Sequence, residues 1–179
     1  MRTQIWTALL VGAAIAAGSA NAQQPAAPAA QPPAAAAPAA PAAPPPAYGN
    51  SITVEQAKKV AAAAVAESRK NNWLMAITIV DTAGELVYFE KMDNTQMASI
   101  QISQGKARTA AKFKRETKVF ADAMAGGANF YLSFDGLVAS PGGVPIVDGG
   151  KIIGAIGVSG ATGAQDHQVA KAAVDAPRS

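Results

Sequence analysis

Small and apolar residues recur at helical spacing directly after Thr53. One face collects them at intervals of three or four positions: Val54, Ala57, Ala61, Ala64, Val65 and Ser68. Residues 53–56, Thr-Val-Glu-Gln, match the capping box, in which the first and fourth side chains bind free backbone N–H groups at a helix start. The pattern therefore predicts a helix that begins at Thr53 and ends near Asn71.

Two pairs of β-branched stretches are each joined by a glycine-containing turn. Residues 74–80 and 85–91 flank Asp-Thr-Ala-Gly, and residues 143–147 and 151–158 flank Asp-Gly-Gly. Glycine adopts the positive φ that such turns need, so each pair is predicted to form a hairpin. A short run at residues 136–139 is a candidate for one further strand.

Three further segments have helical character. Residues 95–114 lack proline and contain one glycine, and their small residues Ser103, Ala107, Ala110 and Ala111 share a face. Residues 116–124 form a second piece that ends at two glycines, and a capping box at Thr162 begins a helix over residues 163–175. The order helix, hairpin, helices, hairpin, helix predicts an α+β fold with an antiparallel sheet of about five strands flanked by helices.

The N-terminal part has a different composition. Residues 1–22 combine Arg2, an apolar stretch and the Ala-Asn-Ala site of a cleavable signal peptide. Residues 23–49 hold nine of the 12 prolines and predict a semi-rigid spacer. We therefore expect a folded domain at residues 50–179, a periplasmic or secreted location, and no stable membrane insertion after cleavage, because the apolar stretch is shorter than a bilayer span.

Composition excludes several kinds of chemistry. The chain has no cysteine, so it contains no thiolate nucleophile, zinc–thiolate site, iron–sulfur cluster or CxxCH haem attachment. A net charge of +3 is too small to favour nucleic acid as a partner. No G-x-S-x-G motif accompanies the single histidine, so we predict no catalytic residues.

His167 follows Asp166 at the start of the last predicted helix. The pair is a candidate ligand set for a metal or a haem iron. The alternative is that both residues are solvated in the first turn, where Asp166 interacts favourably with the helix N-terminus.

Two other features favour an anionic ligand. Arg108, Lys112 and Arg115 fall on one helical stripe and are candidates to clamp acidic groups such as propionates. The alternative is a solvated face or a subunit contact. The glycine-rich segment at residues 157–163 precedes a helix, and its free N–H groups are suited to a carboxylate or phosphate.

Several motifs in order resemble the GlcG/HbpS haem-binding family, which is related to the PduO C-terminal domain. They are Val-Asp-Thr-Ala-Gly at 80–84, Lys-Met-Asp at 91–93, Gly-Lys-Ala-Arg-Thr-Ala at 105–110, Gly-Gly-Val-Pro-Ile at 142–146 and Ile-Gly-Ala-Ile-Gly-Val-Ser-Gly at 153–160. The resemblance implies an antiparallel sheet flanked by helices in a profilin-like layout, a homo-oligomer and haem binding. In the family, haem binding relies on histidine, reportedly in the first helix, and the first predicted helix here has none. Arg108, Lys112 and Arg115 are the candidates to bind the haem propionates, and His167 is the candidate haem-binding residue and metal ligand.

Three hypotheses follow. The first is an exported haem-binding protein for storage, trafficking or sensing. The second is an accessory protein or enzyme for a small hydroxy or keto acid such as glycolate, which the glycine-rich turn at residues 157–163 suggests. The third is an oligomeric interaction module whose contact is the small-residue face of Ser103, Ala107 and Ala111.

Overall fold

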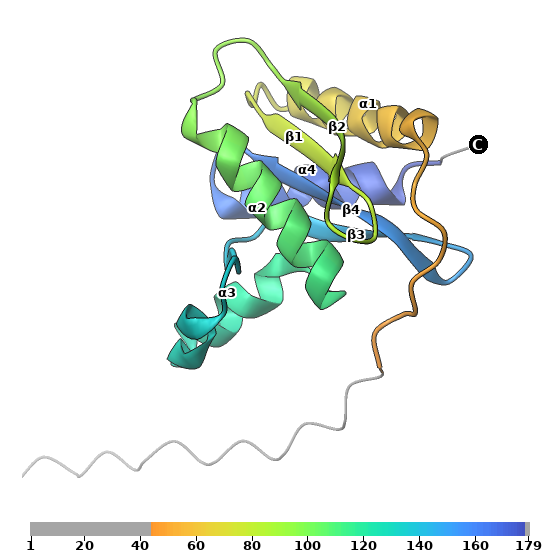
Figure 1. Cartoon of the computed structure of the whole chain (residues 1–179). Helices are drawn as coiled ribbons and strands as arrows, with labels where there is room; N and C mark the ends of the chain where they lie inside the picture. Colours follow the sequence, from red (N-terminus) through yellow and green to blue (C-terminus); the bar gives the residue numbers. More distant parts are fainter. Residues whose placement is uncertain (1–43, 178–179) are drawn as a thin grey trace, which may run out of the picture. The chain divides into compact units, whose positions relative to one another are not determined.

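A computed structural model describes residues 44–177, which form an α+β fold around one four-stranded antiparallel sheet with the order β2-β1-β4-β3 (Figure 1). The elements in chain order are α1 (Val54–Lys70), β1 (Ala76–Val80), β2 (Leu86–Lys91), α2 (Ala98–Phe113), α3 (Thr117–Ala125), the 3-10 helix η1 (Asn129–Ser133), β3 (Gly143–Asp148), β4 (Lys151–Ser159) and α4 (Gly163–Asp175). The predicted fold class and both hairpins are confirmed. The predicted signal peptide and residues 23–43 of the predicted spacer lie outside the described residues.

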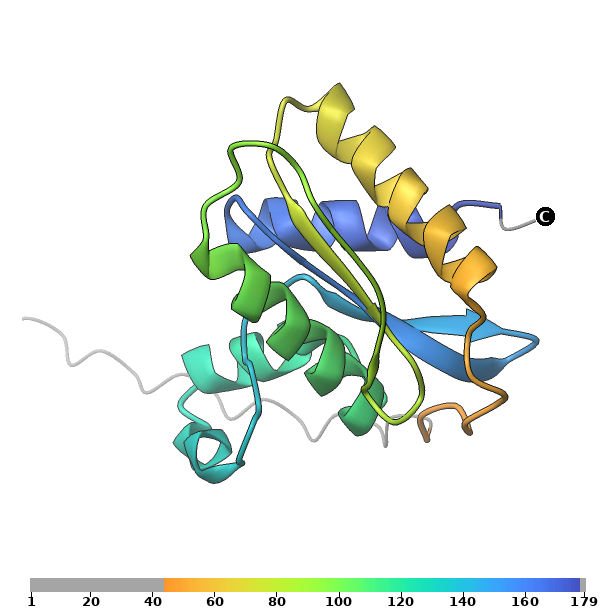
Figure 2. The same ribbon diagram turned by 45° about the horizontal axis from the view of Figure 1, so that its top comes forward.

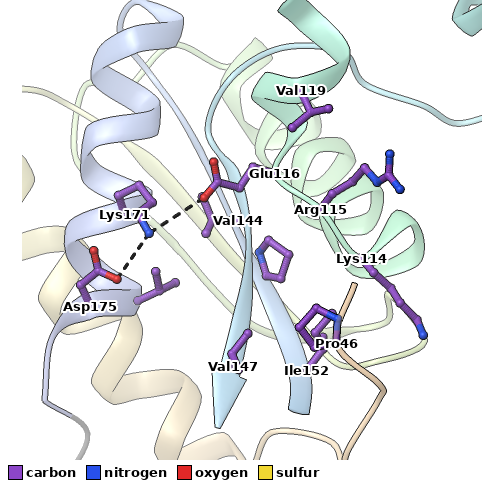
Figure 3. A pocket seen from close by; sticks show the side chains of 12 residues that line it. Pro46, Lys114, Arg115, Glu116, Val119, Val144, Val147, Ile152, Lys171 and Asp175 are labelled. Atoms are coloured by element: carbon purple, nitrogen blue, oxygen red, sulfur yellow. Dashed lines mark hydrogen bonds and ion pairs between the residues drawn. The ribbon is translucent and has the colours of Figure 1, made fainter. Parts of the chain in front are cut away.

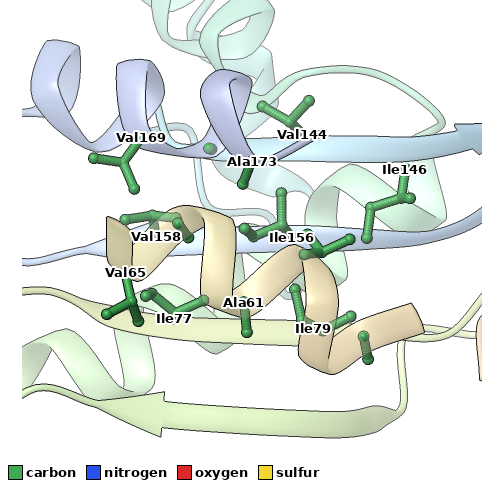
Figure 4. Close-up of a cluster of buried hydrophobic side chains, with 14 of the residues drawn as sticks. Ala61, Val65, Ile77, Ile79, Val144, Ile146, Ile156, Val158, Val169 and Ala173 are labelled. Carbon is green, nitrogen blue, oxygen red and sulfur yellow. The ribbon is translucent and has the colours of Figure 1, made fainter. Parts of the chain in front are cut away.

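Helices cover both faces of the sheet: α1 and α4 lie on one face and α2 on the other (Figures 1 and 2). The face under α1 and α4 carries the main core, in which Ile77 and Ile79 of β1 and Ile156 of β4 are fully buried (Figure 4). Alternate strand residues point to opposite faces, so this core uses every second position. Burial of each isoleucine side chain stabilises the fold by roughly 1.5–3 kcal/mol.

On the opposite face, α2 lies almost directly on the backbone of β4. A Cβ atom at Gly157 would lie 2.0 Å from the carbonyl oxygen of Ser103 and 2.6 Å from the amide nitrogen of Ala107. The hydroxyl groups of Thr78 and Ser103 are hydrogen-bonded at 2.8 Å beneath the helix. This contact therefore depends on small residues from both elements.

The small-residue face of α2 is buried in that contact. Ser103, Ala107, Ala110 and Ala111 are all buried against the sheet of the same chain. The prediction that this face forms an oligomer contact is therefore wrong, since the residues are already covered. The predicted homo-oligomer itself stays a prediction.

Both predicted capping boxes are confirmed. The amide of Gln56 donates to the Thr53 hydroxyl at 3.2 Å, and the amide of Gln165 donates to the Thr162 hydroxyl at 3.4 Å. Each glutamine side chain accepts in return from the backbone N–H of its threonine. Helices α1 and α4 therefore begin where the local sequence predicts.

The sheet has four strands, not about five, because residues 136–139 form no strand. Gly136 has a φ of +72°, and the amide of Val138 donates to the Thr109 hydroxyl instead of to a neighbouring strand.

The segment before α1 is attached to β4. Tyr48 forms a β-bridge with Ile152, and the Ile152 amide donates to the Ala47 carbonyl at 2.9 Å. The end of the predicted spacer therefore packs on the domain. No helix within residues 44–177 has the length and apolarity to cross a bilayer.

Candidate functional site

A groove of about 550 Å³ opens between the α2–α3 junction, β3 and α4 (Figure 3). Its size lies within the range of about 300–1,000 Å³ that is usual for small-molecule and cofactor sites. Its lining residues come from segments far apart in the sequence: Pro46, Lys114, Arg115, Glu116, Val119, Val144, Pro145, Val147, Ile152, Lys171, Val174 and Asp175.

The wall of the groove is apolar. Val144 and Val147 come from β3, Val119 from α3 and Val174 from α4. Strand β3 lies at the edge of the sheet, where Pro145 is tolerated because an outward-facing position needs no backbone donor. The groove therefore offers a hydrophobic surface to a ligand.

Charged side chains form the rim on both sides. Lys114 and Arg115 come from the α2–α3 junction, while Lys171 and Asp175 come from α4 (Figure 3). The Lys171 Nζ lies 3.4 Å from a carboxylate oxygen of Asp175, and the Lys114 Nζ lies 4.1 Å above the ring of Tyr48. The Arg115 side chain makes no hydrogen bond or ion pair with any other residue in the range 44–177. Its charge is therefore available to an acidic group.

The structure separates the three basic residues that the helical stripe had grouped. Helix α2 ends at Phe113, and Lys114 adopts a left-handed conformation with a φ of 55°, so Arg115 leaves the stripe and enters the groove. Arg108 and Lys112 lie beside the β1–β2 turn instead, where a Cβ atom at Gly84 would be 2.9 Å from the Lys112 Cε. These two residues line no part of the groove, so the predicted three-residue clamp is not assembled.

His167 does not line the groove, but it lies next to Glu116, which does. It shares one face of α4 with Lys171 and Val174, which follow at four and seven positions. Its Nε2 is 3.7 Å from a carboxylate oxygen of Glu116, and its Nδ1 is buried without a hydrogen-bond partner in the described part of the chain. No group of three or more potential metal-ligating side chains occurs within residues 44–177. His167 is therefore the imidazole beside the groove, and no cluster of ligating side chains surrounds it in this part of the chain.

A buried ion pair joins α2 to α4. The Lys106 Nζ donates to Asp166 at 2.7 Å and to the Val158 carbonyl at 3.0 Å, and both charged side chains are almost fully buried. Burial lowers the pKa of Lys106 and raises the pKa of Asp166, and the hydrogen bond between them opposes both shifts. The pair joins residues that are 60 positions apart and ties α2 to α4.

The ion pair changes the interpretation of two sequence features. Asp166 is not a solvated first-turn residue, and its carboxylate accepts the backbone N–H groups of Gly160 and Ala161. The anion site predicted at residues 157–163 is therefore occupied by the chain's own carboxylate, and it leaves no place for a small acid there.

The spacing of Lys106 in the sequence already indicates that it is buried. Lys106 follows Ser103 by three positions and precedes Ala110 by four, so it belongs to the small-residue face of the helix. A lysine on such a face is buried only with a partner, because an unpaired buried charge is costly.

Comparison with known proteins identifies the family. The model described as "Haem degrading protein HbpS-like" matches residues 52–175. The chain belongs to the HbpS-like family. It is 44% identical over 108 residues to protein GlcG of Escherichia coli (strain K12), an alignment that covers 60% of this chain and 81% of GlcG.

Solved structures agree with this HbpS-like assignment. A double mutant of HbpS from Streptomyces reticuli is 29% identical, has a TM-score of 0.65 and aligns over 78% of this chain and 96% of that one. The structure titled "Crystal Structure of PduOC:Heme Complex" is 23% identical, has a TM-score of 0.63 and aligns over 69% and 93% of the two chains. At that identity the second likeness supports the fold alone.

The motif at residues 142–146 has a specific place in this HbpS-like domain. Gly142 has a φ of +120°, and a Cβ atom there would lie 2.7 Å from the Val158 carbonyl and 2.8 Å from the Asp166 Cβ. The loop therefore crosses directly over the buried ion pair before it enters β3. Only a glycine fits this crossing, since both the backbone angle and the space exclude a side chain.

Proposed function

We propose that this protein binds haem in the groove between the α2–α3 junction, β3 and α4. The observation that carries the proposal is an apolar wall next to the unpaired guanidinium of Arg115. A haem presents the matching chemistry, because an apolar macrocycle carries two acidic propionates. The description of the family, which names haem, is in keeping with the same ligand class.

Each side chain has a distinct role in this proposal. Val119, Val144 and Val147 would contact the macrocycle, while Arg115 and Lys171 would bind propionates from opposite sides of the groove. The His167 imidazole, whose Nε2 lies 3.7 Å from a carboxylate oxygen of the groove-lining Glu116, would supply the iron ligand. The haem iron would supply redox and ligand-binding chemistry, and the protein would hold and shield it.

Replacement of Arg115 by glutamine should weaken haemin binding about tenfold, because a charge-assisted hydrogen bond to a carboxylate is lost. The measurement is a titration of the purified protein with haemin, followed by the intense haem absorption band. The matched control is Arg108→Gln, which removes the same charge from α2 outside the groove and should leave the affinity unchanged.

The same titration tests the proposal as a whole. His167→Ala should shift the absorption band, and added imidazole should restore it, because an external imidazole can replace the missing ligand. Absence of any spectral change with micromolar haemin in the unaltered protein would exclude haem binding. Equal losses in Arg108→Gln and Arg115→Gln would exclude the groove as the site.

We further propose that the protein is exported and serves in haem storage, trafficking or sensing. The support is the N-terminal pattern of Arg2, an apolar stretch and Ala-Asn-Ala. Protein recovered from the producing cell should then begin at Gln23, which N-terminal sequencing determines. A retained Met1 would contradict export by this route.

A further inference from the structure

A carboxylate inside the groove faces the cations that would bind an acidic ligand. We propose that Glu116 competes with the acidic end of the ligand for Lys171. The ligand must therefore displace Glu116 from Lys171 in order to bind. This inference rests on the proposed haem site and adds a control over its affinity. Glu116 lines the groove together with Arg115 and Lys171 (Figure 3).

The position of Glu116 in the chain supports a role other than helix capping. It is the N-cap residue of α3, where a polar side chain usually accepts a hydrogen bond from the first turn. The Glu116 side chain makes no such bond. It reaches across the groove toward α4 instead, while the neighbouring Arg115 stays on its own side (Figure 3).

The contacts of Glu116 across the groove are long and divided. One carboxylate oxygen lies 3.9 Å from the Lys171 Nζ, and the other lies 3.7 Å from the His167 Nε2. The side chain remains 37% exposed, so water screens both interactions. Such a carboxylate partly neutralises Lys171 without being fixed to it, and it is displaced at little cost.

A bound propionate on Lys171 would lie close to Glu116. Two carboxylates that share one ammonium group repel each other, so Glu116 has to move when the ligand binds. Its removal should therefore strengthen binding, whereas removal of a simple contact residue would weaken it. This opposite sign separates a competitor from a ligand-binding residue.

The experiment compares Glu116→Gln with the unaltered protein in titrations with haemin and with haemin dimethyl ester. The ester keeps the macrocycle and iron but has no acidic groups. Glu116→Gln should bind haemin roughly three to ten times more tightly, because one like charge leaves the site. Its affinity for the ester should be unchanged.

The matched control is Asp122→Asn, which also removes one negative charge from the α3 region but lies outside the groove. It should leave the haemin affinity as it is, so a gain there would indicate only a change in net charge. An unchanged or weaker haemin affinity in Glu116→Gln overturns the competitor role while the haem site stands. Failure of both the unaltered protein and Glu116→Gln to bind either porphyrin overturns the proposed function as well.

Discussion

Substitution of Lys106 by methionine should lower the free energy of unfolding by about 3–5 kcal/mol, the range expected when a buried ion pair loses one partner. Methionine is close to lysine in length and shape, so the loss comes from the charge and not from a large cavity. The Asp166 carboxylate would keep its backbone donors at residues 160 and 161 but would lose its cation in a site closed to water. Urea denaturation followed by circular dichroism measures the change.

Two variants control this result. Lys118→Met breaks an exposed pair with Asp122 and should cost less than about 1 kcal/mol. The double variant Lys106→Met with Asp166→Leu should recover much of the stability, because a buried pair replaced on both sides leaves no uncompensated charge. A double variant less stable than Lys106→Met alone would contradict the view that the orphaned carboxylate causes the loss.

Substitution of Gly157 by alanine should destabilise the domain by about 3 kcal/mol, the upper end of the usual cost of overpacking, because the added methyl group overlaps backbone that has no room to move. The new Cβ atom would lie 2.0 Å from the Ser103 carbonyl oxygen and 2.6 Å from the Ala107 amide nitrogen. Helix α2 would have to lift from β4, and the buried Thr78–Ser103 hydrogen bond would break. Thermal unfolding followed by circular dichroism tests this.

Gly126 provides the comparison for Gly157. A Cβ atom at Gly126 would approach no atom closer than 3.3 Å, and its φ of −81° is ordinary for any residue. Gly126→Ala should therefore change the unfolding temperature little. Equal effects of the two substitutions would mean that general glycine flexibility, and not the close contact of α2 with β4, sets the stability.

Local features of the fold could be predicted from sequence because their causes are local. The capping boxes at Thr53 and Thr162 need only residues three positions apart, and both helix starts are correct. The hairpin turns contain Gly84 and Gly149, whose positive φ angles are typical of glycine, so the local sequence is enough to predict them. The extra strand at residues 136–139 was wrong because its β-propensity was outweighed by a tertiary hydrogen bond from Val138 to Thr109.

The candidate site was less predictable because it is assembled from distant segments. Extending the helical stripe to Arg115 missed the left-handed turn at Lys114, which has no glycine or asparagine to signal it. The Lys106–Asp166 pair spans 60 residues, beyond the reach of any periodicity argument. His167 and Arg115 stay candidates, and only the fold shows that Arg115 lines the groove while His167 lies behind Glu116.

The pairing of Lys106 with Asp166 also means that one partner is synthesised well before the other. A nascent chain that has emerged only as far as β4 already holds Lys106 and its apolar neighbours, but the partner carboxylate is still inside the ribosome. Helix α2 can already pack on β1 and β4 at that stage, but the Lys106 ammonium then has no carboxylate partner until α4 is added. A chain that stops before α4 would therefore keep an uncompensated charge under α2 and an uncovered part of the main core, which destabilises it strongly.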